Sequence, residues 1–206
     1  MLLISLKSLV FWLQRPDKIQ YRVRYWIWEK LHPDQPWLCQ GTVEFCKNHL
    51  STSMSMLEFG SGRSSAWFSQ RVSKLTSIEH DTDWYKLVKR NLEKKNIANV
   101  NLRLIPLDHP LSEPEKEFYD QCPGYVAVLD EFEDESLDFI IIDGHYRTTC
   151  ARKCLNKIKS GGYLLIDDTN LWNSLAALNI PQDWSIVNQS TNGIKTAIVW
   201  QKPLKS

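Results

Sequence analysis

Two short segments, 137–143 and 163–167, consist almost entirely of apolar residues. In the first, the apolar run lies between Asp138 and Asp143, and in the second it ends at Asp167. Strands that are apolar on both faces are typical of the centre of a parallel sheet covered by helices on both sides. Similar short strands are predicted at 54–59, 75–79 and 100–105, with helices predicted at 65–74, 83–95 and 148–159, the last ended by Ser160-Gly161-Gly162. Two further strands, 185–187 and 196–200, flank an Asn192-Gly193 turn and predict an antiparallel hairpin.

This alternation of strands and helices predicts right-handed βαβ crossovers and an α/β fold with a doubly wound, mostly parallel seven-stranded sheet. Residues 1–50 are instead predicted to be helical, broken by Pro16 and by the loop 32–36, because Tyr21, Tyr25, Trp28 and Leu31 have helical spacing. We therefore expect an N-terminal helical cap, residues 1–50, followed by one ligand-binding domain, residues 51–206.

The first 13 residues form an apolar segment that Lys7 interrupts. The segment is shorter than the roughly 20 apolar residues of a membrane span, and it lacks the features of a signal peptide. We expect no transmembrane segment here and favour a helix packed on its own domain. The alternative is a helix at a membrane interface, flanked by Arg15 and Lys18.

Composition excludes several classes of protein. Of 206 residues, 43% are hydrophobic, so the chain is not disordered by composition, and 25 basic against 24 acidic residues leave a net charge of +1. A neutral chain has no global field for nucleic acid, so we expect a small-molecule partner and no nucleic acid. The five cysteines show no CxxC pair, which favours reduced thiols and a cytoplasmic location. A homo-oligomer remains an open alternative.

Tryptophan is abundant: four of the nine tryptophans precede residue 40. An aromatic side chain offers a large apolar face, so we expect these residues to form an aromatic cap beside the site, which either closes over an acceptor or covers an edge of the core.

A glycine turn follows the first predicted strand. Gly60-Ser61-Gly62 comes directly after Glu58 and Phe59, and the next predicted strand ends at Glu79. Glycines at a strand end let the backbone approach a ligand, and an acid at the next strand end is placed to accept both hydroxyls of a ribose. The pattern predicts a nucleoside-containing cofactor; the alternative is a tight turn with a solvated Glu79.

Two nucleoside cofactors compete for this turn. NAD favours a third glycine where this chain has Ser65, because its pyrophosphate rests on the helix N-terminus. An acid such as Glu58 suits a cationic ligand better than a pyrophosphate. S-adenosylmethionine (SAM) has a sulfonium, an ammonium and no phosphate, so charge favours SAM over the NAD of an oxidoreductase.

These motifs resemble those of the class I SAM-dependent methyltransferases. Residues 57–62 resemble motif I of that family, although Ser64 replaces its usual third glycine, and residues 77–81 resemble the ribose-binding end of its second strand. Residues 137–143 and 161–168 resemble its fourth and fifth strands. The resemblance implies a Rossmann-like methyltransferase fold. It also implies cofactor contacts from Glu58, Gly60 and Gly62 to the methionine part, from Glu79 to the ribose, and from Asp108 to the adenine, with Ser61 of the turn as a further cofactor-binding residue.

Polar residues at two later strand ends point to the reaction. His145 could remove a proton from the acceptor as a general base, or position it by a hydrogen bond, and Asp143 could orient the acceptor or cap the next helix. Asp143, Asp167 and Asp168 resemble the ligands of metal-dependent catechol and caffeoyl-CoA O-methyltransferases, which implies Mg²⁺ or another divalent cation. The two later aspartates could instead order their loop.

The sequence therefore predicts a SAM-dependent methyltransferase that acts on a small molecule, with transfer to oxygen favoured. The helical cap, residues 106–135 and the loop after Asp168 are expected to form the acceptor pocket. Arg63 and Arg147 are each expected to be ordinary surface charges, the alternative being that they bind an anionic acceptor. The alternatives are an NAD-binding oxidoreductase and a catalytically inactive SAM-binding or interaction module.

Overall fold

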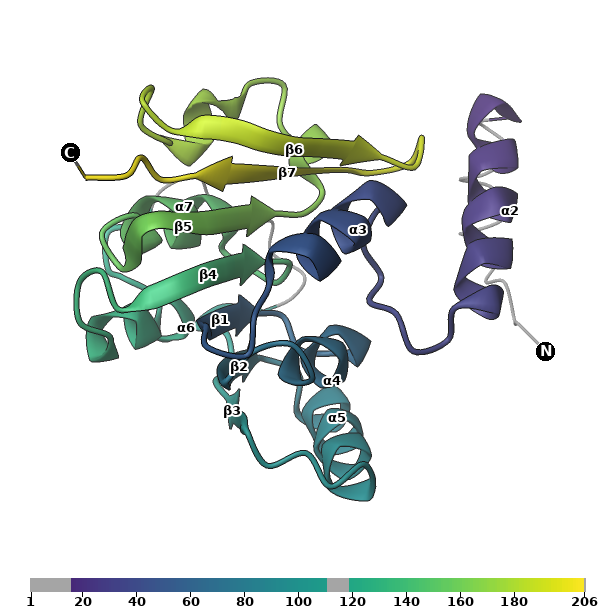
Figure 1. Cartoon of the computed structure of the whole chain (residues 1–206), viewed down its shortest axis with the longest axis horizontal. Coiled ribbons are helices and arrows are strands. Elements are labelled where there is room, and N and C mark those ends of the chain that lie inside the picture. Colours follow the sequence, from purple (N-terminus) through teal and green to yellow (C-terminus); the bar gives the residue numbers. More distant parts are fainter. Residues whose placement is uncertain (1–15, 111–118, 206) are drawn as a thin grey trace.

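The computed structural model describes residues 16–110 and 119–205, which form a seven-stranded sheet in the order β3-β2-β1-β4-β5-β7-β6 (Figure 1). Strands β1 to β5 are parallel, and β7 runs antiparallel to both β5 and β6. This confirms the predicted mostly parallel sheet and its hairpin ending. The strands are β1 Ser55–Phe59, β2 Lys74–Glu79, β3 Val100–Leu104, β4 Leu137–Ile142, β5 Ile158–Ile166, β6 Ser185–Thr191 and β7 Thr196–Gln201.

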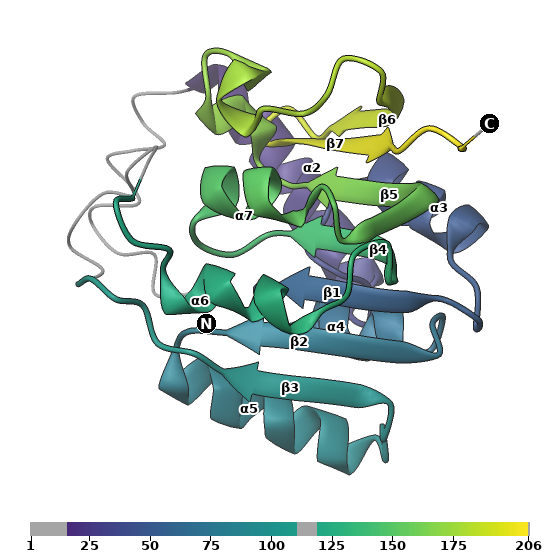
Figure 2. The same ribbon diagram turned by 90° about the vertical axis from the view of Figure 1, so that its left-hand side faces the viewer.

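Helices cover both faces of this sheet (Figure 2). The covering helices are α3 Gln40–His49, α4 Arg63–Ser69, α5 Thr82–Lys94, α6 Gly124–Ala127 and α7 Arg147–Cys154, whereas α2 Pro16–Leu31 stands at one edge of the sheet (Figure 1). Three 3₁₀ turns lie at Val128–Glu131, Thr169–Leu171 and Leu175–Leu178. The described part of 106–136 thus holds only short elements, as predicted.

The apolar strand β4 separates two cores. Ile140 and Ile142 pack with α6 and α7 on one face, whereas Phe139 and Ile141 pack with α3 and α4 on the other. Side chains alternate across a strand, so a strand covered on both faces must be apolar at nearly every position. This burial explains the continuous apolar run in the sequence.

The predicted helix 148–159 is wrong at its C-terminal end. Helix α7 ends at Cys154, and β5 begins at Ile158, so Ser160-Gly161-Gly162 lies within a strand and does not cap a helix. The reason is pairing with a distant segment: Gly161 N–H donates to the Lys202 carbonyl, and Lys202 N–H donates to the Gly162 carbonyl. Local glycine signals cannot reveal such long-range pairing.

The predicted helix 65–74 is also too long, because α4 ends at Ser69 and β2 already begins at Lys74. Asn99 caps the C-terminal end of this helix, because its side-chain amide donates hydrogen bonds to the carbonyls of Ser69 and Val72. A residue thirty positions away therefore sets the boundary.

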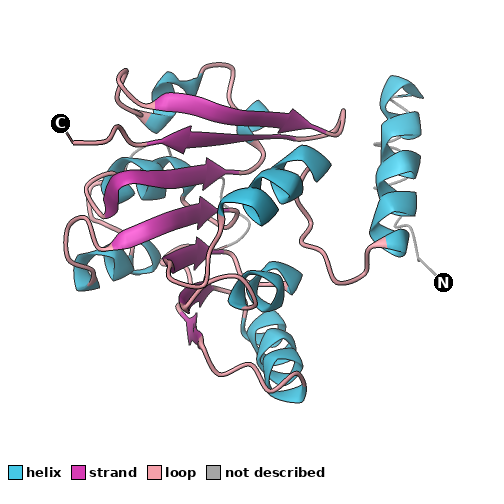
Figure 3. Cartoon of the chain, in the orientation of Figure 1, coloured by secondary structure: helices cyan, strands magenta, loops and turns pink. Residues whose placement is uncertain are grey.

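The N-terminal helices differ in how they pack. Helix α3 packs on the sheet, with Val43, Phe45 and Cys46 buried, whereas none of the residues of α2 is buried. Pro16 is the first residue of α2, where its missing N–H costs nothing. Helix α2 stands across the edge at which the parallel strands end (Figures 1 and 3). The apolar segment 1–13 lies outside the described residues.

Among the residues that the structure describes, no helix combines the length and the apolarity that crossing a lipid bilayer requires.

Candidate functional site

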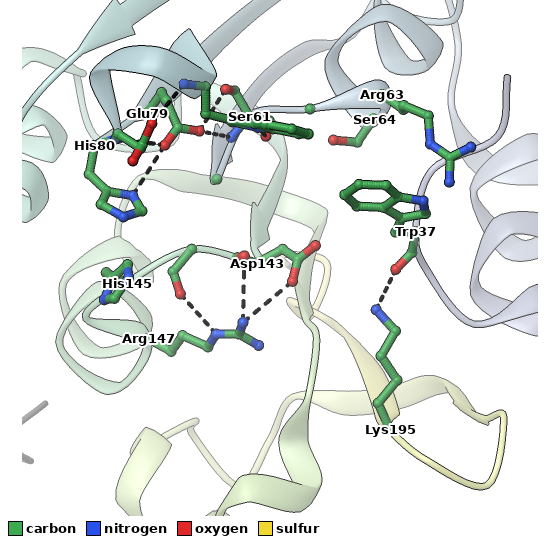
Figure 4. A pocket seen from close by; sticks show the side chains of 15 residues that line it. Trp37, Ser61, Arg63, Ser64, Glu79, His80, Asp143, His145, Arg147 and Lys195 are labelled. Carbon is green, nitrogen blue, oxygen red and sulfur yellow. Dashed lines mark hydrogen bonds and ion pairs between the residues drawn. The ribbon is translucent and has the colours of Figure 1, made fainter. Parts of the chain in front are cut away.

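A cavity of about 520 Å³ lies at the carboxyl ends of β1, β2 and β4 (Figure 4). Ligands of doubly wound sheets bind at this edge, and the volume is within the usual range of small-molecule sites. Its lining comes from five separate chain segments: Trp37, 60–64, the group Glu79, His80, Asp81 and Trp84, the group Asp143, Gly144, His145 and Arg147, and Lys195.

Gly60 brings the glycine turn against the end of β4. Its φ of +95° is rarely adopted by other residues, and a Cβ at this position would lie 2.8 Å from the Asp143 carbonyl group. Gly144 is equally confined, because a Cβ there would lie 2.2 Å from the hydroxyl oxygen of Tyr125. Both glycines are therefore required for the two strand ends to meet beneath the cavity.

Glu79 at the end of β2 is the most firmly held carboxylate of the cavity. Its Oε2 accepts hydrogen bonds from the backbone N–H (3.1 Å) and hydroxyl (2.7 Å) of Ser61. Its Oε1 accepts from the backbone N–H groups of His80 (2.8 Å) and Asp81 (2.9 Å). Burial opposes ionisation of Glu79, but hydrogen bonds from His80, Asp81 and Ser61 outweigh it and lower its pKa. The carboxylate is thus ionised and fixed in orientation.

Glu58 lies beneath the glycine turn and does not line the cavity. Its carboxylate is fully buried and accepts hydrogen bonds from the hydroxyls of Ser65 (2.5 Å) and Ser77 (2.6 Å). Ser65 in turn accepts a hydrogen bond from the Gly62 N–H at 3.1 Å. Burial raises the pKa of Glu58 to about 7, against the opposing effect of the serine hydroxyls. Glu58 therefore supports the turn from below.

Asp108 also lies away from the cavity lining. Its carboxylate accepts a hydrogen bond from the Gly124 N–H at 2.7 Å, at the start of α6, and its own N–H donates to the hydroxyl of Tyr146. The structure thus brings the predicted residues Gly60, Ser61, Gly62 and Glu79 together in the cavity, and it places Glu58 and Asp108 outside the lining.

The three predicted metal ligands meet at the ends of β4 and β5. Asp143, Asp167 and Asp168 each offer one oxygen, and these oxygens lie within 4.8 Å of one another. Two cations of the protein already contact them: Lys195 forms an ion pair with Asp167, and Arg147 lies 3.1 Å from Asp168 and 3.5 Å from Asp143. A divalent cation and these side chains would compete for the same oxygens.

Arg147 is largely buried, so the prediction that it is an ordinary surface charge is wrong. Only 13% of its side chain is exposed, and its guanidinium also donates to the carbonyls of Gly144 (2.9 Å) and Asp167 (2.5 Å). Burial opposes ionisation of Arg147, but the charges of Asp143 and Asp168 raise its pKa. Burial, followed by the charge of Asp167, raises the pKa of Asp143 well above its usual range. The negative charge of the cluster is thus balanced by positively charged side chains of the same chain.

Lys195 is a site residue that the sequence interpretation missed. It follows the β6–β7 turn, and its ammonium also donates to the carbonyl of Trp37 in the α2–α3 linker. The turn is held because Asn192 accepts hydrogen bonds from the N–H groups of Ile194 and Lys195, both at 3.0 Å. Because β7 is antiparallel to β5, this turn lies at the same sheet edge as the end of β5. The predicted hairpin was the signal that could have revealed it.

Two tryptophans form the aromatic wall of the cavity. Trp37 stacks on Trp84 with ring centroids 5.9 Å apart, and the Trp84 indole donates to the Ser61 carbonyl at 2.8 Å. The Arg63 guanidinium lies 4.6 Å from the centre of a Trp37 ring, which is cation–π geometry. Arg63 also pairs with Glu29 of α2 at 3.5 Å. The linker after α2 is thereby tied to the glycine turn.

His145 follows β4 and lines the cavity beside His80, with their ring centroids 4.3 Å apart. The ring of His80 lies against Glu79, with Nδ1 3.2 Å from Oε1. His80 thus lies between the ring of His145 and the carboxylate of Glu79.

The same fold is found in solved methyltransferases. An rRNA methylase from Streptococcus thermophilus matches with a TM-score of 0.57 and 16% identity over 78% of this chain and 93% of that one. A SAM dependent methyltransferase from Aquifex aeolicus matches with 0.53 and 14%, over 82% and 95%. An RNA methyltransferase from Salinibacter ruber, in complex with S-adenosyl-L-homocysteine, matches with 0.51 and 13%, over 80% and 89%. The sheet order and these matches define the Rossmann-like fold of class I methyltransferases.

A family model described as a methyltransferase domain matches residues 57–169, which is more than half of the chain. The chain therefore belongs to this methyltransferase family, as its motifs predicted. Comparison with curated proteins found no match.

Proposed function

We propose that this protein transfers the methyl group of SAM to an oxygen of a small-molecule acceptor in the cavity between β1, β2 and β4. The observation that carries the proposal is the fixed Glu79 carboxylate beside the Gly60-Ser61-Gly62 turn. The turn exposes backbone to a ligand, and the carboxylate accepts hydroxyl hydrogen bonds.

The Ser61 hydroxyl marks the position of a ligand hydroxyl on Glu79. It donates to Oε2 at 2.7 Å, which is ideal for an O–H donor to a carboxylate. A ribose hydroxyl could take the same place once Ser61 rotates, while the N–H groups of residues 61, 80 and 81 keep the carboxylate oriented. The adjoining indole of Trp84 offers an apolar face to a flat base.

SAM supplies a methyl group on a positively charged sulfur, and this methyl group is transferred directly to a nucleophile. The chain therefore has to orient the acceptor and to hold its proton. We assign acceptance of that proton to His145, because it lies on the cavity wall and an imidazole nitrogen can act as a general base. Asp143, two residues before His145, also lines the cavity with its carboxylate 3.5 Å from Arg147, and we assign it to orienting the acceptor hydroxyl.

The acidic cluster is neutralised from within the chain. Arg147 and Lys195 contribute two positive charges to the three carboxylates. A further divalent cation would have to displace the Lys195 ammonium from Asp167. We therefore propose methyl transfer without a bound metal, and derive no step through one.

A small acceptor is favoured by the charge balance. The chain has a net charge of only +1, and the cavity lining balances three acids, Glu79, Asp81 and Asp143, with three cations, Arg63, Arg147 and Lys195. Such a lining has no excess of positive charge to attract a polyanion such as RNA. Two of the similar solved structures are named as RNA methylases, but they share only the fold with this chain. RNA is therefore the alternative acceptor class that an experiment has to exclude.

The test is transfer of tritium from methyl-labelled SAM to two acceptor pools, a low-molecular-weight cell extract and total RNA. We expect label only in the small-molecule pool, with EDTA leaving the rate unchanged. His145→Gln should lower the rate by about a hundredfold or more, the usual contribution of a general base. Label in RNA would overturn the acceptor class, and loss of activity in EDTA would overturn the metal-free cluster.

A further inference from the structure

Helix α2 has one face that contacts the rest of the protein, formed by Tyr21, Tyr25 and Trp28. The Tyr21 ring lies so close to the β6–β7 turn that a Cβ at Gly193 would be 2.4 Å from it. The Tyr25 hydroxyl donates to the Leu38 carbonyl at 3.5 Å, and its ring stacks on Trp28. The aromatic face therefore accounts for the docking of α2 at the sheet edge.

The opposite face of α2 is apolar and exposed. Its side chains recur at helical spacing, so they form one continuous strip along the helix. We call this strip the outer stripe, and its members with their exposed fractions are Ile19 39%, Val23 49%, Trp26 42%, Ile27 46% and Leu31 72%. Five large apolar residues on one exposed helix face are unusual for the surface of a water-soluble domain.

Basic side chains lie beside and within the outer stripe. Helix α2 has four basic residues against the acids Asp17 and Glu29. By helical spacing Arg22 and Arg24 flank the stripe, Lys30 lies within it, and Lys18 shares the face of Tyr21 and Tyr25. Glu29 is already engaged, because it pairs with Arg22 at 3.4 Å and with Arg63 at 3.5 Å. The Lys30 ammonium lies 5.9 Å from the centre of a Trp26 ring, directly at the stripe. Arg22 is partly neutralised by its pair with Glu29, so the surface combines apolar side chains with the positive charges of Arg24 and Lys30.

We propose that the outer stripe binds α2 in the plane of an anionic lipid bilayer. Aliphatic side chains and tryptophan enter the boundary between headgroups and acyl chains, while lysine and arginine contact anionic headgroups. The residues just before α2 in the sequence, 1–13, are also mostly apolar.

Two other occupants fit the surface less well. A second copy of α2 would bring its own basic side chains against these, and like charges across an interface are unfavourable. RNA would be attracted by the charges and could stack on Trp26, but the four aliphatic members of the stripe, Ile19, Val23, Ile27 and Leu31, offer it neither hydrogen bonds nor a stacking surface. An anionic bilayer satisfies both parts of the surface.

The experiment is flotation of the full chain with vesicles of phosphatidylcholine alone or with one quarter phosphatidylglycerol. We expect binding to the anionic vesicles that weakens as salt rises. Ile27→Asp should lower the partition coefficient at least tenfold, because it places a charge within the stripe. The matched control is Leu87→Asp on α5, whose side chain is 48% exposed outside the stripe, and it should bind like the wild type.

Circular dichroism of both variants establishes that they are folded before binding is compared, and Arg24→Glu provides a second variant that alters only a basic side chain beside the stripe. It should weaken binding to anionic vesicles. The proposal is overturned if the wild type does not float with anionic vesicles, or if Ile27→Asp floats equally well. It is also overturned if the wild type is a dimer that Ile27→Asp dissociates, or if transfer RNA binds the chain while vesicles do not.

Discussion

At the scale of single residues, the site depends on where each carboxylate lies. Glu58 and Glu79 end neighbouring strands, yet Glu58 is buried among serine hydroxyls and Glu79 is held by backbone N–H groups at the cavity. The sequence predicts that both acids stand beside the glycine turn. It does not reveal that Glu58 points beneath it, because this depends on Ser65 and Ser77 from two other elements.

The buried Glu58 should make stability depend on pH. Its pKa is raised from an ordinary 4.5 to about 7, so the folded chain keeps a proton that the unfolded chain loses between these values. The free energy of unfolding should therefore fall as pH rises from 4.5 to 7, by roughly 3 kcal/mol from this group, and stay level above 7.

Chemical denaturation of the wild type and Glu58→Gln at pH 5 and pH 7.5 measures this contribution. Between pH 5 and pH 7.5, the free energy of unfolding of the wild type should fall relative to that of Glu58→Gln. The exposed Glu44→Gln serves as the control and should follow the wild type. If the free energies of unfolding of the wild type and Glu58→Gln differ by the same amount at both pH values, Glu58 ionises normally.

At the scale of elements, the β6–β7 turn joins parts of the chain that are far apart in sequence. Lys195 contacts Asp167 at the end of β5 and the Trp37 carbonyl in the linker after α2. The hairpin itself could be predicted from Asn192-Gly193 and its flanking strands. The partners of Lys195 could not, because they follow from the antiparallel placement of β7 beside β5.

Lys195→Met should therefore be strongly destabilising. It leaves Asp167 buried with one fewer counterion, and breaking a buried pair costs about 3–5 kcal/mol. Adding Asp167→Asn should restore much of the loss, since the uncompensated charge is then absent. Lys86→Met breaks an exposed pair with Asp83 and should cost less than about 1 kcal/mol.

Thermal and denaturant unfolding of these variants measures both effects. Equal costs for Lys195→Met and Lys86→Met would show that Lys195 contributes no more than a surface ion pair. Failure of the double variant to recover stability would show that the loss came from packing and not from charge.

At the scale of the whole molecule, the apolar strands, the glycine turn and the strand-end acids were sufficient to predict the sheet and the class of enzyme. The Trp37–Trp84 stack supports an aromatic wall, but the exposed Trp26 belongs to a different surface. Helix ends near Ser69 and Cys154 could not be predicted, because Asn99 and the chain around Lys202 determine them from a distance. Local patterns therefore locate the chemistry better than they locate the boundaries.

SAM is proposed to bind in this cavity through Glu79, and calorimetric titration of SAM into the wild type and Glu79→Ala measures the contribution of this carboxylate. Removing a carboxylate that accepts ribose hydroxyls should weaken binding by about tenfold or more, since hydrogen bonds to charged groups contribute about 1.5–3 kcal/mol each. Glu44→Ala, on the exposed side of α3, should bind SAM like the wild type. Wild-type protein that binds no SAM, or a folded Glu79→Ala variant with undiminished affinity, would contradict the account.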